Sequence, residues 1–135
     1  MNERISPILL DQRIRNRIIE YLEIASSYDQ QLEYEANVPI ARVPNEIINL
    51  WEDSVRRGHL DEFAEPVYSP NEQAAIRRFH AVWDGVAKDT PDQMPPLSKL
   101  IGTEPWERLR VAAQQALAVF RLRGKFNEDR EQFSK

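Results

Sequence analysis

His80 and Asp84 are the two residues whose types and spacing come nearest to a catalytic pair. One helical turn separates them, so the carboxylate could orient the imidazole as a general base requires. His80 also borders the apolar face of its predicted helix, where a core-edge histidine bonded to Asp84 would need no substrate. Both interpretations remain open at this stage. Tyr21 and Tyr28 are the candidates to complete a small pocket with this pair.

The sequence predicts no metal or cofactor site. A di-iron or di-manganese bundle needs a Glu-x-x-His pair on each of two helices. Here Arg56 and Arg77 stand three residues before His59 and His80. The chain has no cysteine, which excludes disulfides, thiol catalysis and thiolate ligands. Its four glycines form no phosphate-binding loop.

The basic residues do not predict a nucleic-acid interface. Arg56 and Arg57 lie within a turn of Glu52 and Asp53, which is typical of an ordinary solvated helix face. The formal charge of the 135-residue chain is −4, which argues against a dedicated nucleic-acid binder. We therefore expect no nucleic-acid partner.

The composition is that of a single soluble domain. Hydrophobic residues make up 41% of the chain and charged residues 30%, which excludes a membrane-like or a disordered chain. The first residues hold only a short apolar run, Ile8 to Leu10, far below the length of a membrane span. We expect one cytoplasmic helical domain over residues 1–135, with residues 1–5 and 127–135 frayed, and no membrane partner.

The elements that must position these residues are helices, and residues 69–88 give the clearest pattern. Ser69 and Glu72 form a capping box, and Pro70 suits the first helical position. Apolar residues then recur on one face of this helix at helical spacing, including Phe79 and Trp83. That face requires a core built by other helices.

The first predicted helix is long, from Pro7 to about Ala36. Ser26 and Ser27 are its weakest point, since their hydroxyls compete for backbone hydrogen bonds and could bend the helix. Its seam has the 4, 3, 4, 3, 4 spacing of helical bundles and consists of Ile14, Ile18, Tyr21, Ala25, Tyr28 and Leu32.

Two more helices and a proline-rich loop complete the predicted fold. A helix over residues 44–57 would end at Gly58 with a left-handed cap. Residues 89–102 contain three prolines and predict an ordered loop with one short turn. The last helix is predicted over residues 104–123, with Thr103 as its N-cap and Gly124 as the residue that stops it. We predict an all-α bundle of four main helices with a long first helix.

The last helix carries a second apolar stripe beside its core stripe. Val111, Ala118 and Leu122 form it. Such a stripe is either buried, because the helix is central, or left for a partner. In the second case a homodimer is the simplest arrangement.

One end of the predicted bundle separates charges. The connector holds three acids, Asp61, Glu62 and Glu65, and the close of the last helix holds three bases, Arg121, Arg123 and Lys125. The two sets could neutralise each other, or the acids could face outward and steer a basic partner.

These observations favour a non-catalytic helical interaction protein that acts through a protein partner or through self-association. A regulator, an adaptor, an antitoxin or an immunity-type protein would fit. The alternative is a small enzyme or ligand-binding bundle with a pocket near His80 and Asp84. A cavity shared by His80 and a tyrosine would favour the alternative.

Overall fold

The structure is a computed structural model that describes residues 6–40, 42–55, 60–91 and 93–133. Over these ranges it contains helices and no strand, which confirms the predicted all-α class. None of the helices in these ranges is long and apolar enough to cross a membrane. The elements are α1 (Pro7–Ala25), α2 (Tyr28–Asn37), α3 (Val43–Ser54), η1 (Leu60–Glu62), α4 (Pro70–Asp89), α5 (Leu97–Leu100) and α6 (Glu104–Arg121).

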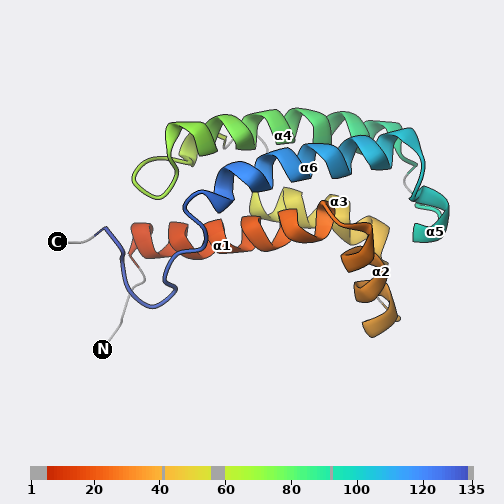
Figure 1. The fold of residues 1–135 in the computed structure, drawn as a ribbon, viewed down its shortest axis with the longest axis horizontal. Coiled ribbons are helices and arrows are strands. Elements are labelled where there is room, and N and C mark those ends of the chain that lie inside the picture. Colours follow the sequence, from red (N-terminus) through yellow and green to blue (C-terminus); the bar gives the residue numbers. More distant parts are fainter. Residues whose placement is uncertain (1–5, 41, 56–59, 92, 134–135) are drawn as a thin grey trace.

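The long helices run side by side along the molecule (Figure 1). α6 packs between α4 and α1, and α3 packs against α1. α2 and α5 lie at one end of the molecule, and η1 lies at the other end, where α1 begins and α6 finishes. The two ends of the molecule therefore consist of different elements.

The core is centred on large aromatic side chains. Trp51, Trp83 and Trp106 are all buried, as their positions on the apolar faces predict. Trp51 packs edge-on against Phe79, with ring centroids 4.6 Å apart, and Tyr21 covers both rings. Each of the three indole N–H groups donates a hydrogen bond inside the protein, so no tryptophan N–H is left without an acceptor.

The start of α4 is formed by the predicted capping box. The Ser69 hydroxyl accepts a hydrogen bond from the backbone N–H of Glu72 at 3.2 Å, and Glu72 Oε1 accepts one from the backbone N–H of Ser69 at 2.9 Å. This reciprocal pair satisfies two of the N–H groups that the first turn leaves without partners.

The single long first helix was a wrong prediction, because two helices meet at the serine pair. α1 ends at Ala25, and the extended backbone of Ser27 lets its hydroxyl cap α2 by accepting from the N–H of Gln30 at 3.1 Å. Gln31 then donates to the carbonyls of Ile24 and Ala25, the end of α1, at 3.1 and 3.2 Å. The weak point indicated by the serines is therefore a complete break.

The break also changes the seam. Leu32, predicted inward, is 43% exposed. In α1 the buried face includes Ile18, Tyr21 and Ala25, as predicted, but also Ile19 and Leu22. The face that α1 turns to the core is thus wider than the predicted seam, and Ile14 packs at its edge, partly buried.

The last helix ends close to its predicted limit. The Gly124 N–H donates to the carbonyl of Phe120 at 2.8 Å, and Gly124 has φ +75°, a conformation that favours glycine. Thr103 does precede the helix, but its hydroxyl donates to the carbonyl of Leu100 at 2.7 Å and makes no cap. The predicted cap at Gly58 and the arginines before it lie outside the described residues.

Candidate functional site

The most polar cluster inside the protein joins Arg15, Glu72 and Arg123. Arg15 is 0% exposed, and the Glu72 side chain is 2% exposed. Arg15 donates to the two carboxylate oxygens of Glu72 at 2.6 and 2.9 Å, and Arg123 donates to the same oxygens at 2.6 and 3.1 Å. Glu72 therefore holds two guanidinium groups while it also caps α4.

Backbone carbonyls and aromatic rings complete this cluster. Arg15 donates to the carbonyls of Val67 and Gly124, each at 3.0 Å, and Arg123 donates to the carbonyl of Val67 at 2.8 Å. The Arg15 guanidinium carbon lies 4.1 Å from the centre of the Phe126 ring. Every strong donor thus faces an acceptor or a ring, as a buried charge requires.

The electrostatics of Glu72 follow from these contacts. Burial alone raises the pKa of its carboxyl, but the hydrogen bonds from Arg123, Arg15 and the Ser69 amide outweigh burial and lower the pKa to about 2. Glu72 is therefore ionised at neutral pH. Because its oxygens are occupied by two arginines and an amide, the cluster is an anchor between α1, α4 and the end of α6 and has no room for a substrate.

The sequence did not reveal this anchor. Arg15 lies on the same face of α1 as Ile18, Ile19 and Leu22, at spacings of 3, 4 and 7. A charged residue at those spacings could have signalled a buried ion pair. Its partner could not be named, because Glu72 is distant in sequence and already had a local role in the capping box.

The segment after α6 lies along α1 and is held by polar side chains. Gln12 donates to the carbonyls of Asn127 and Arg130 at 2.7 and 2.9 Å. Asn16 exchanges two hydrogen bonds with the backbone of Phe126, at 2.8 and 2.9 Å. The sequence predicts fraying for residues 127–135, whereas in the structure these contacts join Phe126, Asn127 and Arg130 to the first helix; residues 134–135 lie outside the described part.

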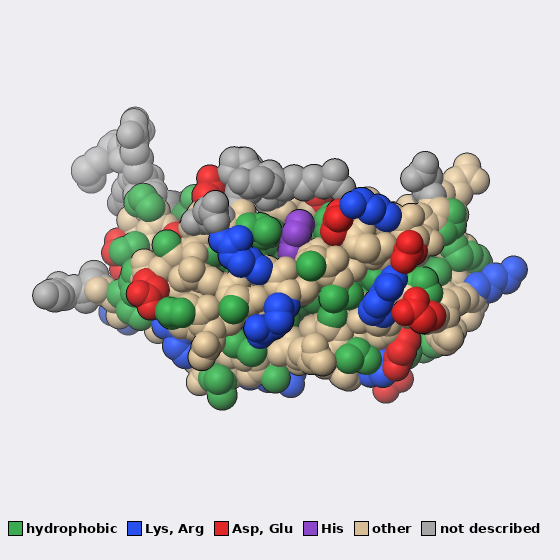
Figure 2. Space-filling model, turned by 90° about the horizontal axis from the view of Figure 1, so that it is seen from above, with side chains coloured by type: hydrophobic (Ala, Val, Ile, Leu, Met, Phe, Trp, Pro, Cys, Tyr) green, Lys and Arg blue, Asp and Glu red, His purple; other side chains and the backbone are tan. Residues whose placement is uncertain are grey.

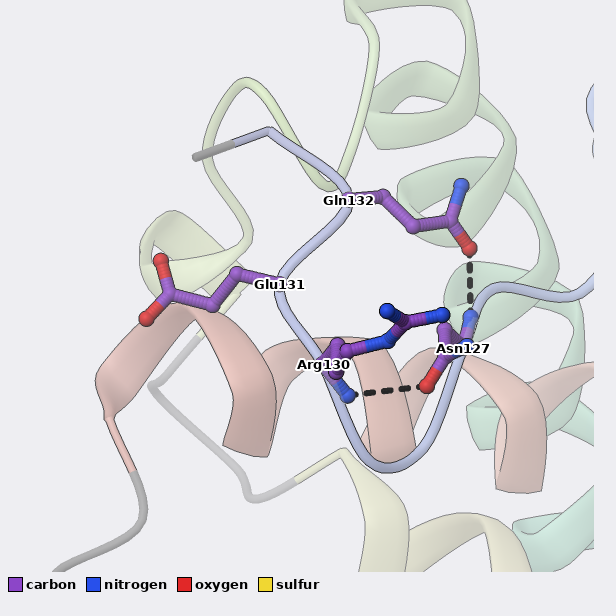
Figure 3. A pocket seen from close by; sticks show the side chains of 4 residues that line it. All are labelled: Asn127, Arg130, Glu131 and Gln132. Atoms are coloured by element: carbon purple, nitrogen blue, oxygen red, sulfur yellow. Dashed lines mark hydrogen bonds between the residues drawn. The ribbon is translucent and has the colours of Figure 1, made fainter. Parts of the chain in front are cut away.

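A hollow of about 500 Å³ opens inside this terminal loop (Figure 3). Its lining consists of Asn127, Arg130, Glu131 and Gln132. Asn127 Oδ1 accepts from the backbone N–H of Arg130 at 2.8 Å, and the backbone N–H of Asn127 donates to the Gln132 side chain. The polar groups of this loop close on one another, so the loop shape explains them without a ligand.

The predicted catalytic candidates have structural roles. Nδ1 of His80 accepts a hydrogen bond from Trp51 Nε1 at 3.1 Å, and the imidazole stacks on Trp83 with centroids 5.4 Å apart. Asp84 Oδ2 accepts a hydrogen bond from Lys88 Nζ at 2.9 Å. A proton placed on Nδ1 would break the bond to the buried Trp51, which makes this nitrogen a poor general base.

The two tyrosines proposed to join His80 are occupied as well. The Tyr21 hydroxyl donates to the carbonyl of Ile47 at 2.7 Å, and burial raises its pKa. The Tyr28 hydroxyl donates to Glu107 at 2.8 Å, at the far end of α6 from the terminal loop. Five of the best-formed hollows among the described residues are lined neither by His80 nor by a tyrosine. The same residues also contain no group of acids and histidines that could hold a metal ion.

Arg123 and Lys125, two of the three bases at the η1 end, pair with acids outside the connector. Arg123 forms an ion pair with Glu72, and Lys125 forms one with Glu20 at 3.1 Å. Glu62 lies near Asp11, whose pKa is raised first by burial and then by the charge of Glu62. Glu65 is exposed, and the side chain of Asp61 is outside the described part. Two of the three bases thus find carboxylates away from the connector.

The second stripe of α6 is exposed. Val111 is 38% exposed and Leu122 is 81% exposed, although α6 packs on both α1 and α4. Both lie opposite the core face of α6, in a row at bundle spacing that consists of Glu104, Arg108, Val111, Gln115, Ala118 and Leu122. The alternative that a central helix buries this stripe is therefore wrong.

A shallow hollow lies beside this row, between α4 and α6. It has a volume of about 380 Å³ and is lined by Val82, Glu104, Glu107, Arg108, Val111, Ala112 and Gln115; we call it the α4–α6 hollow. A second hollow of about 300 Å³ continues it along the same two helices, past Ala75 and Ala81. The two hollows exist because both helices carry small side chains here, such as Ala81 on α4 and Ala112 on α6. Figure 2, which views the molecule from the α4 side, shows hydrophobic side chains at the surface between basic and acidic ones.

The α6 row and the α4–α6 hollow are thus the candidate functional site, because together they expose apolar surface without an internal partner. Comparison with protein-family models, with curated proteins and with solved structures finds no match to this chain. The function has to be inferred from this geometry.

Proposed function

We propose that this protein is a non-catalytic helical interaction protein that acts through a protein partner or through self-association. In this proposal α1, α3, α4 and α6 are the four main helices of a rigid bundle, with the proline-rich segment before α6 as an ordered loop. The α6 row is the surface that the bundle presents. Roles such as a regulator, an adaptor, an antitoxin or an immunity-type protein all use such a surface.

The observation that carries the proposal is the 81% exposure of Leu122 in line with Val111 on a well-packed helix. Large aliphatic side chains in a row beside an apolar hollow are typical of protein interfaces. The charged groups around them, such as Glu104 and Arg108, resemble the polar rim of an interface.

The alternative, a small enzyme or ligand-binding bundle near His80 and Asp84, lacks comparable support. Nδ1 of His80 accepts a hydrogen bond from Trp51. The hydroxyls of Tyr21 and Tyr28 donate to the carbonyl of Ile47 and to the Glu107 carboxylate. A reactive site would need some of these groups to face a substrate.

The experiment is an affinity capture from the native cell, followed by direct binding measurements with each purified candidate. We compare the wild-type chain, the double variant Val111→Asp/Leu122→Asp, and the control Gln30→Asp, which adds a charge at an exposed position of α2. We expect the double variant to lose binding and the control to keep it.

A thermal-shift screen with metabolites is the counterpart of this capture. If a small molecule stabilises the wild-type chain but not His80→Ala, and no protein or second copy binds, the interaction proposal is refuted. Binding of a protein that ignores the double variant would place the interface elsewhere on the bundle and would refute the assignment to α6.

A further inference from the structure

The α6 row combines a projecting side chain and a recess on one helix. Leu122 projects at the end of α6 and is 81% exposed. The α4–α6 hollow lies near the beginning and middle of the same helix, between Glu104 and Gln115. At 1.5 Å per residue, roughly 20 Å separate Leu122 from the middle of the hollow. Leu122 therefore cannot fill the hollow of its own chain.

A second copy can satisfy both features at once. If two α6 helices pack antiparallel about a twofold axis near the middle of the row, Leu122 of each copy meets the Glu104 end of the other copy's hollow. The small side chains of Ala112 and Ala118 would let the helices approach closely. Resting on the function proposed above, we infer that the partner of the α6 row is a second copy of this chain, in an isologous antiparallel dimer.

The charges along α6 fit this arrangement. The helix begins with Glu104, whose side chain is 73% exposed and lies 3.8 Å from Arg108 Nε, whereas Glu107 is held by Arg110 at 2.6 Å. It ends with Arg121, which is exposed and forms no ion pair with the described residues. An antiparallel pairing about the middle of the row brings Glu104 of each helix to the level of Arg121 of the other, and these two side chains have opposite charges. A parallel pairing would place like charges together.

The hollow itself adds a polar requirement. Arg108 lines it and pairs with Asp89 at 2.7 Å, while its Nε atom lies 3.8 Å from Glu104 and makes no hydrogen bond in the described part of the chain. A helix packed across the hollow would bring further polar side chains, such as Gln115 of the second copy, near this donor.

The first test measures the oligomeric state of the intact chain by sedimentation equilibrium over a concentration series. We expect a dimer for the wild-type chain and at least a 100-fold weaker association for Leu122→Asp, about 2.7 kcal/mol by the tenfold rule. Gln30→Asp is the control with the same added charge on α2 and should dimerise like the wild type. Circular dichroism checks that each variant is folded.

The second test uses charge reversal and is specific for an antiparallel homodimer. Glu104→Lys and Arg121→Glu should each weaken self-association about tenfold, because like charges then face each other twice. An equimolar mixture of the two variants should form a heterodimer, because both contacts between positions 104 and 121 then join opposite charges. Since both side chains are exposed, these variants keep the fold even if Leu122→Asp does not.

Three results would overturn the inference. A chain that stays monomeric up to about 1 mM has no homodimer of use to a cell. A dimer whose association is unchanged by Leu122→Asp uses another surface. Single charge variants that do not prefer each other exclude the antiparallel pairing. None of these results refutes the proposed function, which fails only if no protein, including a second copy, binds the chain.

Discussion

Neutralising Glu72 should destabilise the fold far more than neutralising an exposed acid with a similar pKa. In Glu72→Gln, Arg15 stays 0% exposed but loses the carboxylate that faces its two terminal nitrogens. Removing one member of a buried ion pair costs about 3–5 kcal/mol, because the remaining charge is left in a poor solvent. Arg123 would lose the same partner but could turn to water, since it is exposed.

The pH dependence gives an independent magnitude. The carboxyl of Glu72 has a pKa of about 2 in the folded chain, against an ordinary value of 4.5. At ~1.4 kcal/mol per pKa unit, this difference of about 2.5 units is worth about 3.5 kcal/mol. Because the folded pKa is the lower one, the contribution is fully present above pH 4.5 and is lost as the pH falls towards 2. The cost expected from removing the buried ion pair and the free energy expected from the pKa shift are therefore of similar size.

The assay is urea unfolding followed by circular dichroism, at neutral pH and in steps down to pH 2. Glu72→Gln should lower the free energy of unfolding at neutral pH, and the difference from the wild type should shrink below pH 4.5. Glu107→Gln is the control: hydrogen bonds from Arg110 and Tyr28 lower the pKa of Glu107 to about 2 as well, but on the surface. We expect it to change stability little.

Two results would refute this reasoning. If Glu72→Gln costs less than about 1 kcal/mol at neutral pH, Arg15 is not a buried charge that depends on Glu72. If the loss is large but the same at every pH, the variant has disturbed packing or the cap of α4, and the ion pair is not its cause.

Two further predictions test the core and the terminal segment. Phe79→Ala should cost about 3–5 kcal/mol in thermal or urea unfolding, because Phe79 is buried against Trp51, whereas Arg77→Ala on the outer face should cost well under about 1 kcal/mol; equal costs would mean that α4 is turned the other way. Deleting residues 126–135 should lower stability by about 2–4 kcal/mol, since Asn16 and other buried groups on α1 lose their partners, and unchanged unfolding curves would show that the segment is dispensable.

The features that the sequence predicted well are those decided within a few residues. The capping box of Ser69 and Glu72 spans four positions, and the inward tryptophans follow from helical spacing alone. The end of α6 at Gly124 is equally local. Such features need no knowledge of which helices meet.

The features that were missed depend on distant partners. The break at Ser26 and Ser27 was recognised as a weak point, but it is stabilised by Gln31, which bonds the end of α1 and also accepts from Trp106 at 3.0 Å. The burial of Arg15 depends on Glu72 in the same way. Polar side chains on an apolar face can be interpreted only when the opposite face is known.

The candidate site was predicted in part. The stripe of Val111 and Leu122 followed from periodicity, but periodicity could not decide whether a neighbour covers it. The α4–α6 hollow had no sequence signal, because it results from the relative placement of two helices. His80 was noticed for its chemistry, and only the position of Trp51 shows that its Nδ1 atom is committed.

Glu72 both caps α4 and binds two arginines, and this affects the order in which the chain can fold. Its bond to Ser69 closes a loop of a few residues and can form early, whereas its bonds to Arg15 and Arg123 join positions 57 and 51 residues away. Neither half of the chain contains Arg15, Glu72 and Arg123 together. In a fragment cut at the connector, Arg15 would be hydrated and α1 would not pack against α4 and α6. The two halves should be unfolded when separate and should regain helical structure when mixed, which makes the chain one cooperative unit despite its many short-range contacts.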